Sequence, residues 1–240
     1  KQPPPEEDCP ICFLQLPFLD PTGKKYYSCC GKTICSGCSH APVYDDQGNE
    51  VDNEKCPFCR TPWANSDEEM NERRKKRVEA GDPIANYDLG CAYRDGARGL
   101  PQDYTKSLKL FHQAAELGCA ESYTNIGNSF LEGNGVGRDL MKAQIYWELA
   151  AKNGQADARY NLGCKEYNAH NYDRALTHYM IAVRGGDNDS LDAIQLMLKR
   201  GHVTKDDYAK ALVTRQAYLG EIRSPQRDEA AAFGKQYKYY

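Results

Sequence analysis

No apolar run in this 240-residue sequence approaches the roughly 20 residues needed to cross a bilayer. The net charge is only −3, so the chain has no general surplus of the basic residues that bind phosphate backbones. We therefore expect no membrane and no nucleic acid among its partners. A glycine-rich phosphate loop, a Ser/His/Asp set and a paired-carboxylate motif are also absent, and this argues against covalent catalysis by the chain.

Cysteine is abundant, and its distribution is uneven. Zinc binds four thiolate or imidazole donors, and a Cys-x-x-Cys turn supplies two of them from one tight loop. Eight thiols match two tetrahedral structural sites and leave no position for a catalytic water, so we expect two Zn2+ ions per chain. The eight of the 11 cysteines that lie in the first 60 residues are Cys9, Cys12, Cys29, Cys30, Cys35, Cys38, Cys56 and Cys59.

A disulfide framework is the alternative use of these cysteines. The number of cysteines is odd, and the sequence has no basic-then-apolar segment of the secretory type at its start. Both observations favour metal binding in a reducing compartment. We expect an intracellular protein, either cytoplasmic or nuclear.

The first 80 residues divide into three segments. Residues 1–8 are rich in proline and acidic residues, which is typical of a disordered lead-in. The zinc segment, residues 9–63, is too short to bury a sufficient apolar core, so metal binding must supply its folding free energy. Residues 64–80 contain a capping-box pattern from Ser66 to Glu69 and predict a helical connector.

The connector carries a run of five basic residues at 73–77. Such a run is similar to a nuclear-import signal, but it also follows three acidic residues, 67–69, at helical spacing. We favour a solvated helix with ion pairs between successive turns.

A nine-residue frame between two glycines occurs three times after residue 80, and a weaker fourth copy begins at Gly186. The frames begin at residues 81, 118, 154 and 186, so they are 37, 36 and 32 residues apart. This period is typical of α-solenoids, whose units bury a core by stacking. The recurring small residues are Ala85, Ser122, Ala158 and Ser190, and the recurring aromatic residues are Phe111, Trp147 and Tyr179.

Helical spacing explains these columns. Residues three, four and seven apart share one face of a helix, so each unit is predicted to be a helical hairpin with its small and aromatic residues in the core. Cys91 and Cys164, one residue after a frame glycine, are expected to be small buried core residues. Asp103, Asp139, Asn171 and Asp207 are expected to cap the second helices.

The expected solenoid covers residues 81–220, with units 81–117, 118–153 and 154–185 and a degenerate unit 186–220. Residues 221–240 are expected to form a C-terminal capping helix and a tail. Its helix is predicted to open at Ser224-Pro225 and to run to about Phe233, because proline is favoured at the first helical position.

The cysteine segment resembles a RING finger. Cys9-Pro10-Ile11-Cys12 and Cys56-Pro57-Phe58-Cys59 are similar to the first and last knuckles of that family. The resemblance implies a cross-brace of two zinc sites. Its first site would contain Cys9, Cys12, Cys35 and Cys38, and its second site would contain Cys29, Cys30, Cys56 and Cys59.

One position departs from the RING pattern. The family has Cys-x-His before its third knuckle, and Lys32 stands here in place of the histidine. Cys29 can restore the ligand count, and His40 is the alternative donor. A PHD finger has the same ligand order, but it has a tryptophan where this chain has Glu54.

RING proteins contact a ubiquitin-conjugating enzyme through an aliphatic residue of the first knuckle and a proline of the last. A cation after the last cysteine contacts both that enzyme and its ubiquitin. The resemblance assigns these roles to Ile11, Pro57 and Arg60. Arg60 would be linchpin-like and would act by positioning, with no covalent intermediate on this chain.

The helical units resemble Sel1 repeats, relatives of tetratricopeptide repeats that serve as protein-binding scaffolds. Together the two resemblances imply a small zinc-stabilised RING domain followed by an all-α solenoid of Sel1-like hairpins. The matching columns are Leu89-Gly90, Ile126-Gly127, Leu162-Gly163, Gly133 to Val136, and Lys142-Ala143.

The implied function is that of a RING-type ubiquitin-protein ligase. The RING would recruit a conjugating enzyme charged with ubiquitin, and the repeats would bind an unidentified protein target. The alternative is a zinc-stabilised adaptor without ligase activity, which has no need of Ile11, Pro57 and Arg60.

Overall fold

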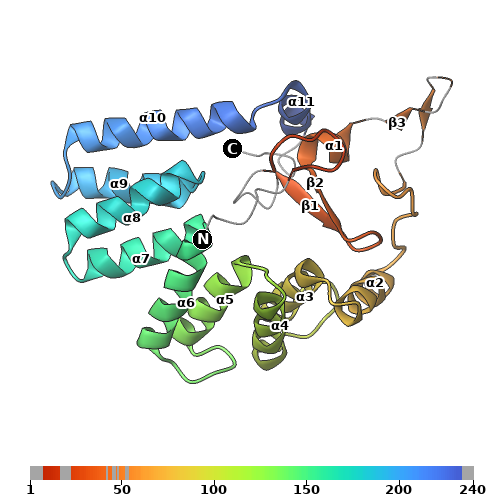
Figure 1. Cartoon of the computed structure of the whole chain (residues 1–240), viewed down its shortest axis with the longest axis horizontal. Helices are drawn as coiled ribbons and strands as arrows, with labels where there is room; N and C mark the ends of the chain where they lie inside the picture. The colour runs from red at the N-terminus through yellow and green to blue at the C-terminus, as the bar shows by residue number, and fades with distance from the viewer. Residues whose placement is uncertain are drawn as a thin grey trace. The chain divides into compact units, whose positions relative to one another are not determined.

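The computed structural model describes residues 8–16, 23–41, 43–44, 47, 49–51 and 54–233 (Figure 1). The expected lead-in, residues 1–8, lies outside the described residues apart from Asp8. Of the described residues, those up to 119 and those from 223 onward form one compact unit, the cysteine-rich unit. Residues 120–222 form a second compact unit, the repeat unit.

The cysteine-rich unit begins with two short antiparallel hairpins. In the first hairpin Lys24 lies opposite Cys35 and Tyr27 lies opposite Lys32. The strands are β1 (Lys24–Tyr27), β2 (Lys32–Cys35), β3 (Val43–Tyr44) and β4 (Glu50–Val51). The helices of this unit are α1 (Ser36–His40), α2 (Asp67–Glu79), α3 (Pro83–Asp95), α4 (Tyr104–Glu116) and α11 (Pro225–Phe233).

Helix α2 begins as predicted, because the hydroxyl of Ser66 accepts a hydrogen bond from the amide of Glu69 at 3.2 Å. Its basic run matches the expected solvated face only in part: Arg73 pairs with Glu69 one turn earlier at 2.6 Å, and Lys75 is exposed. Arg74 is only 6% exposed and pairs with Asp88 of α3 at 2.5 Å. Arg73 donates to the carbonyl of Pro62 at 2.8 Å. The run therefore joins α2 to other segments of the same unit.

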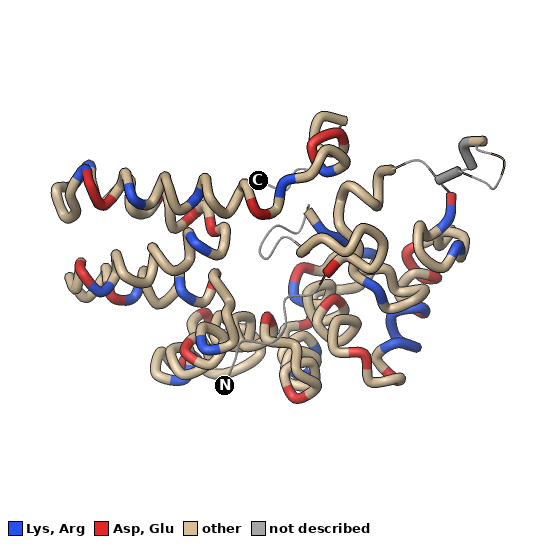
Figure 2. The backbone as a smooth tube through the Cα atoms, turned by 45° about the horizontal axis from the view of Figure 1, so that its top comes forward, with Lys and Arg blue, Asp and Glu red and all other residues tan. Residues whose placement is uncertain are grey.

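The repeat unit consists of three helical hairpins. Helix α8 contacts both α9 and α10. Acidic and basic residues are interspersed along these helices (Figure 2). No helix among the described residues is both long and apolar enough to span a membrane. The hairpins are α5 (Glu121–Glu132) with α6 (Leu140–Lys152), α7 (Ala156–Asn168) with α8 (Tyr172–Arg184), and α9 (Asn188–Lys199) with α10 (Lys205–Ile222).

Helices α3 and α4 form a similar hairpin in the cysteine-rich unit. In the hairpins α3–α4, α5–α6 and α7–α8, the second glycine of the frame faces the aromatic residue of the same hairpin. A Cβ atom on Gly127 would lie 2.6 Å from the ring of Trp147, so no larger residue fits without displacing the indole. The aromatic column is core, as predicted: Phe111, Trp147 and Tyr179 are 0%, 5% and 2% exposed. The corresponding distances are 2.8 Å for Gly90 to Phe111 and 2.5 Å for Gly163 to Tyr179.

Two of the four predicted helix caps are confirmed. Asp103 and Asp139 each accept hydrogen bonds from the first turn of the helix that follows. Asn171 occupies the expected position, but its amide donates instead to Glu166 Oε2 at 2.8 Å. At α10 the cap is Thr204, whose hydroxyl accepts from the amide of Asp207 at 3.2 Å.

The two cysteines of the frame are less enclosed than expected. Cys91 and Cys164 are both half-buried. The hydroxyl of the buried Tyr179 donates to the sulfur of Cys164 at 3.4 Å, so this thiol serves as the hydrogen-bond acceptor for the tyrosine.

The C-terminal helix has the predicted bounds, but its role differs from the predicted one. We expected it to cap the repeats, and α11 belongs instead to the cysteine-rich unit, where it packs against α1. The contact is close because α1 carries a glycine: a Cβ on Gly37 would lie 2.9 Å from the backbone nitrogen of Arg227. Ala230 and Ala231 are buried on the same helix.

The repeat unit is expected to fold without metal. Residues 120–222 contain three hairpins and only one cysteine, Cys164, so packing alone must stabilise them. Expressed alone, this fragment should give a helical circular dichroism spectrum and a cooperative thermal transition that a zinc chelator leaves unchanged. A spectrum of a disordered chain would contradict this.

The close contact of Gly127 with Trp147 predicts a specific sensitivity. Gly127→Val should lower the free energy of unfolding of the 120–222 fragment by about 2–3 kcal/mol, because the added side chain overpacks the core. Gly137→Val is the matched control, since a Cβ there meets no atom within 4 Å. Its change should stay within about 0.5 kcal/mol in the same denaturant titration.

Candidate metal centre

The first Cys-x-x-Cys segment is a tight loop closed by backbone hydrogen bonds. The amide of Phe13 donates to the carbonyl of Cys9 at 2.9 Å, and the amide of Cys9 donates to Leu14 at 2.9 Å. Phe13 has a φ of 57°, in the left-handed region that a side chain rarely adopts. This turn directs the thiols of Cys9 and Cys12 to the same side.

The last Cys-x-x-Cys segment repeats that geometry. The amide of Arg60 donates to Cys56 at 3.0 Å, the amide of Cys56 donates to Thr61 at 2.8 Å, and Arg60 has a φ of 58°. The two segments share the pattern Cys-Pro-x-Cys, and the residue after the second cysteine is left-handed in both. The same local sequence therefore forms the same knuckle twice.

The middle cysteines lie at the two ends of strand β2. Cys29 and Cys30 lie in the turn between β1 and β2, and the amide of Cys30 donates to Tyr27 at 3.2 Å. Cys35 ends β2 and caps α1, because its sulfur accepts from the amide of Cys38 at 3.4 Å. Strand β2 thus places one pair of thiols before it and one pair after it.

The eight thiols gather into two groups of four. Within each group the sulfur atoms all lie within 4.8 Å of one another. This is the division that the RING resemblance implies, with pairs taken alternately along the chain. The first group is Cys9, Cys12, Cys35 and Cys38, and the second group is Cys29, Cys30, Cys56 and Cys59.

The sulfur separations fit a tetrahedral metal. Zinc–sulfur bonds of about 2.3 Å place the sulfurs of a tetrahedral site about 3.8 Å apart. Cys12 and Cys35 are separated by 3.8 Å, Cys30 and Cys56 by 3.9 Å, and Cys29 and Cys59 by 3.5 Å. A disulfide needs about 2.0 Å, and all 11 cysteines are free. Both groups can therefore hold a zinc ion.

Cys29 completes the second group, and His40 belongs to neither group. The ring of His40 packs on the ring of Phe233, with 4.5 Å between the centroids. Lys32, at the position of the usual RING histidine, begins strand β2. The adjacent pair Cys29 and Cys30 thus supplies two thiols to the second group, where the RING pattern has Cys-x-His.

The thiols of the first group have pKa values that are shifted in opposite directions. Hydrogen bonds from the thiols of Cys35 and Cys38 hold the pKa of Cys9 far below its usual range. The hydrogen bonds to Cys35 and Cys9 raise the pKa of Cys38. In the second group, burial raises the pKa of Cys30 to about 11. A divalent cation would remove this conflict, because it favours the thiolate form of all four ligands.

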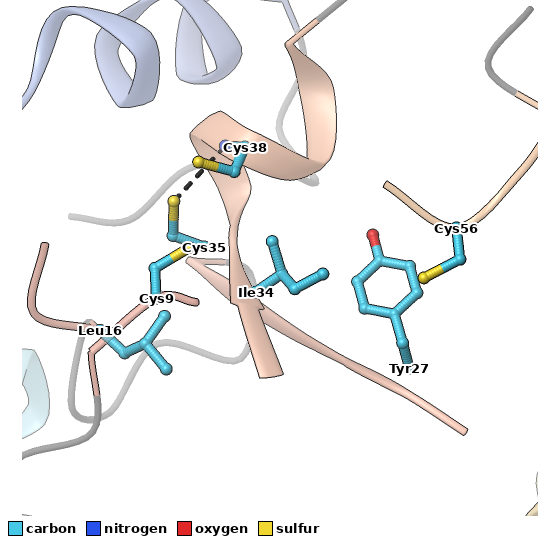
Figure 3. Packing of buried hydrophobic residues seen from close by; sticks show 7 residues of the cluster. All are labelled: Cys9, Leu16, Tyr27, Ile34, Cys35, Cys38 and Cys56. Carbon is cyan, nitrogen blue, oxygen red and sulfur yellow. Dashed lines mark hydrogen bonds between the residues drawn. The ribbon is translucent and has the colours of Figure 1, made fainter. Parts of the chain in front are cut away.

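A small apolar cluster separates the two groups. Ile34 is fully buried and Tyr27 is 3% exposed, and in Figure 3 both lie between the first-group thiols and Cys56. The ring of Tyr27 stacks on Trp63 at 5.6 Å. The buried cluster of the segment consists of Leu16, Tyr27 and Ile34 together with the cysteines.

The three predicted contact residues lie on the two knuckles. Ile11 is 38% exposed, and Pro57 is half-buried. Arg60 is half-buried, and its Nη1 atom is buried without a hydrogen-bond partner among the described residues. Phe13 and Phe58, which the sequence reasoning did not single out, are 78% and 44% exposed beside them.

Three further residues near the thiols were missed by the sequence reasoning. Arg77 donates to the carbonyl of Cys29, Asp82 accepts from Tyr26, and Arg227 donates to Gln15. Arg77 stood in the noted basic run, and Asp82 precedes a helix-opening proline. Nothing in the sequence around Arg227 indicates a partner more than 200 positions away.

Known proteins resemble separate parts of the chain. A family model for the Sel1 repeat matches residues 83–119 and 120–155. The crystal structure of a Sel1 repeat protein from Oxalobacter formigenes aligns with a TM-score of 0.54 and 27% identity, over 64% of each chain.

Two curated plant proteins are similar over shorter stretches. The ERAD-associated E3 ubiquitin-protein ligase component HRD3B of Arabidopsis thaliana is 34% identical over 88 residues, which are 36% of this chain and 13% of that protein. The E3 ubiquitin-protein ligase GW2 of Oryza sativa subsp. indica is 40% identical over 58 residues, which are 23% of this chain and 11% of that protein. The chain thus matches only a small part of each relative. The Sel1 repeat model covers residues 83–155, and the likeness to the solved structure supports a Sel1-like helical solenoid for the all-α part.

Proposed function

We propose that the cysteine segment is a RING-type zinc domain that recruits a ubiquitin-conjugating enzyme, and that the Sel1 repeats bind the protein to be modified. The observation that carries this proposal is the alternating division of eight thiols into two tetrahedral groups. The similarity to HRD3B, a ligase component, and to GW2, a ligase, supports a role in the ubiquitin system.

The metal would serve a structural purpose. Each group contains four cysteines, so bound zinc would have no open position for water or substrate. The ions would supply folding free energy to a segment whose buried cluster consists largely of the ligands themselves. The eight thiolates would hold the two knuckles at fixed positions on either side of strand β2.

The knuckles expose apolar side chains beside the guanidinium of Arg60, so they suit a protein surface that combines apolar side chains with carbonyl acceptors. Ile11, Phe13 and Phe58 expose apolar area that a soluble protein rarely leaves uncovered without a use. Arg60 follows the last cysteine and is half-buried, and the planar fork of a guanidinium suits it to bridging two acceptors. We assign docking to Ile11 and Pro57 and positioning of the ubiquitin thioester to Arg60.

The target would be held by exposed positions of the repeats. The aromatic column is buried, so it stabilises the hairpins and is not available to a partner. Met141 and Ile145 of α6 are 70% and 54% exposed and offer apolar contacts one turn apart. The alternative, an adaptor without ligase activity, is favoured only by the similarity to HRD3B, which is a ligase component.

Elemental analysis of the purified chain should give two zinc ions, and chelation should unfold the cysteine segment. Cys29→Ser should lower the content to about one ion, because this thiol belongs to the second group. His40→Ala should leave two ions. Retention of two ions by the Cys29→Ser protein, together with a loss in the His40→Ala protein, would reverse the ligand assignment.

Ile11→Ala should weaken binding of a conjugating enzyme and reduce ubiquitin-chain formation at least tenfold, because it removes an exposed apolar anchor. Surface plasmon resonance and a self-ubiquitination assay measure the two effects. Ile181→Ala is the matched control, since Ile181 is similarly exposed but lies on α8. Equal activity of both variants would contradict the docking role.

Arg60→Asn should bind the conjugating enzyme nearly normally but discharge its thioester at least tenfold more slowly. Asparagine tolerates the left-handed backbone at this position, so the change tests the guanidinium and not the fold. Zinc content must remain at two ions in this variant. If the intact protein binds no conjugating enzyme and accelerates no discharge, the adaptor function replaces the ligase function.

A further inference from the structure

The backbone beside each cysteine group is held by one arginine from a distant helix. Arg77 extends from α2 to the second group, and Arg227 extends from α11 to the first. We propose that these two arginines are positioning residues of the metal centre, each acting on one zinc site. The inference rests on the proposed zinc occupancy, but not on ligase activity.

Arg77 holds the turn that carries the unusual adjacent cysteines. Its Nε and Nη2 atoms donate to the carbonyls of Ser28 and Cys29 at 3.3 and 3.2 Å. These two carbonyls belong to the peptide groups on either side of Cys29. A planar guanidinium that bonds both of them restricts the direction in which the Cys29 thiol points.

The same turn is held from a second side by Asp82, at the start of α3. One carboxylate oxygen accepts from the hydroxyl of Tyr26 at 2.7 Å, and the other caps α3 by accepting from Ile84 and Ala85 at 3.0 and 3.1 Å. Gly31 makes this approach possible, because a Cβ there would lie 2.8 Å from Asp82 and 3.1 Å from Arg77.

Arg227 performs the corresponding task at the first knuckle. Its side chain is only 1% exposed, and Nη2 donates to the carbonyl of Gln15 at 2.6 Å and approaches that of Leu14 at 3.5 Å. These carbonyls follow Cys12 by two and three residues. The helix that carries Arg227 also packs on α1, which contains the first-group ligand Cys38.

Both contacts are costly to lose. Arg227 is buried and Arg77 is half-buried, and the backbone carbonyls that they bond lose a donor when the guanidinium is removed. Outer residues that orient metal ligands typically change metal affinity by about 10–100-fold. Because Arg77 hydrogen-bonds the backbone beside the second group and Arg227 the backbone beside the first, the structure assigns Arg77 to the second site and Arg227 to the first.

Zinc release from the full-length chain into a chromogenic chelator tests this assignment. Two single-site proteins are needed: Cys59→Ser retains the first group, and Cys12→Ser retains the second. Arg227→Ala should accelerate release at least tenfold in the Cys59→Ser protein and leave the Cys12→Ser protein within twofold. Arg77→Ala should show the reverse selectivity.

Control variants separate positioning from general destabilisation. Lys76→Ala on α2 and Glu229→Ala on α11 remove exposed charges from the same helices and should leave both release rates unchanged. Arg77→Lys and Arg227→Lys keep the charge but cannot reproduce the planar fork, so their rates should be intermediate. If an alanine variant fails to fold, the zinc release rate of the corresponding lysine variant is measured in its place.

Equal acceleration at both sites, or no acceleration at either, would overturn the proposal. Such a result in a chain that binds two zinc ions would leave the proposed function untouched. A wild-type chain that binds no zinc would instead contradict both. Ubiquitin transfer is not measured in any of these experiments, so loss of ligase activity cannot be mistaken for loss of positioning.

Discussion

The first 63 residues depend on the convergence of four sulfur atoms at two points. Their buried cluster contains three non-cysteine side chains, Leu16, Tyr27 and Ile34, which bury far too little apolar area to offset the loss of chain entropy. The hairpin of β1 and β2, the short helix α1 and the two knuckles carry the cysteines of both groups. Each knuckle accepts a left-handed residue, Phe13 or Arg60, in order to present its thiols.

The helical hairpins are stabilised by close packing of side chains. Their helices contain no metal ligands, and their stability comes from close approach of side chain to backbone, as between Gly163 and Tyr179. Some polar groups buried by this packing are satisfied between helices, whereas the buried hydroxyls of Ser122 and Ser190 have no hydrogen-bond partner among the described residues. The indole nitrogen of Trp147 donates to Asn128, which also accepts from Asn161 of the next hairpin. The cysteine segment, if it holds zinc as proposed, and the helical hairpins would therefore fail by different routes: the segment by loss of metal, the hairpins by loss of close packing.

Local patterns predicted much of this structure. The glycine and aromatic columns predicted the hairpins and their core, and the capping box at Ser66 predicted the start of α2, because these signals act within a few residues. The pairing of thiols came from a family resemblance and not from periodicity. Arg74 was expected in solvent and is buried on Asp88, and α11 was expected beside the repeats. Both depend on contacts between distant segments, which no local pattern encodes.

The cysteine-rich unit is discontinuous, and this has a consequence for biosynthesis. Its last helix follows the repeat unit, so a ribosome that synthesises from the N-terminus completes residues 120–222 before it makes α11. If the cysteine segment binds zinc as proposed, it would load metal, or remain unfolded, while about 160 further residues, from residue 64 to the start of α11, are made. Arg227 reaches the first knuckle only afterwards. On the proposed zinc binding, a cell that is short of zinc would hold chains whose repeats are folded while the cysteine segment, which is made first, is still unfolded.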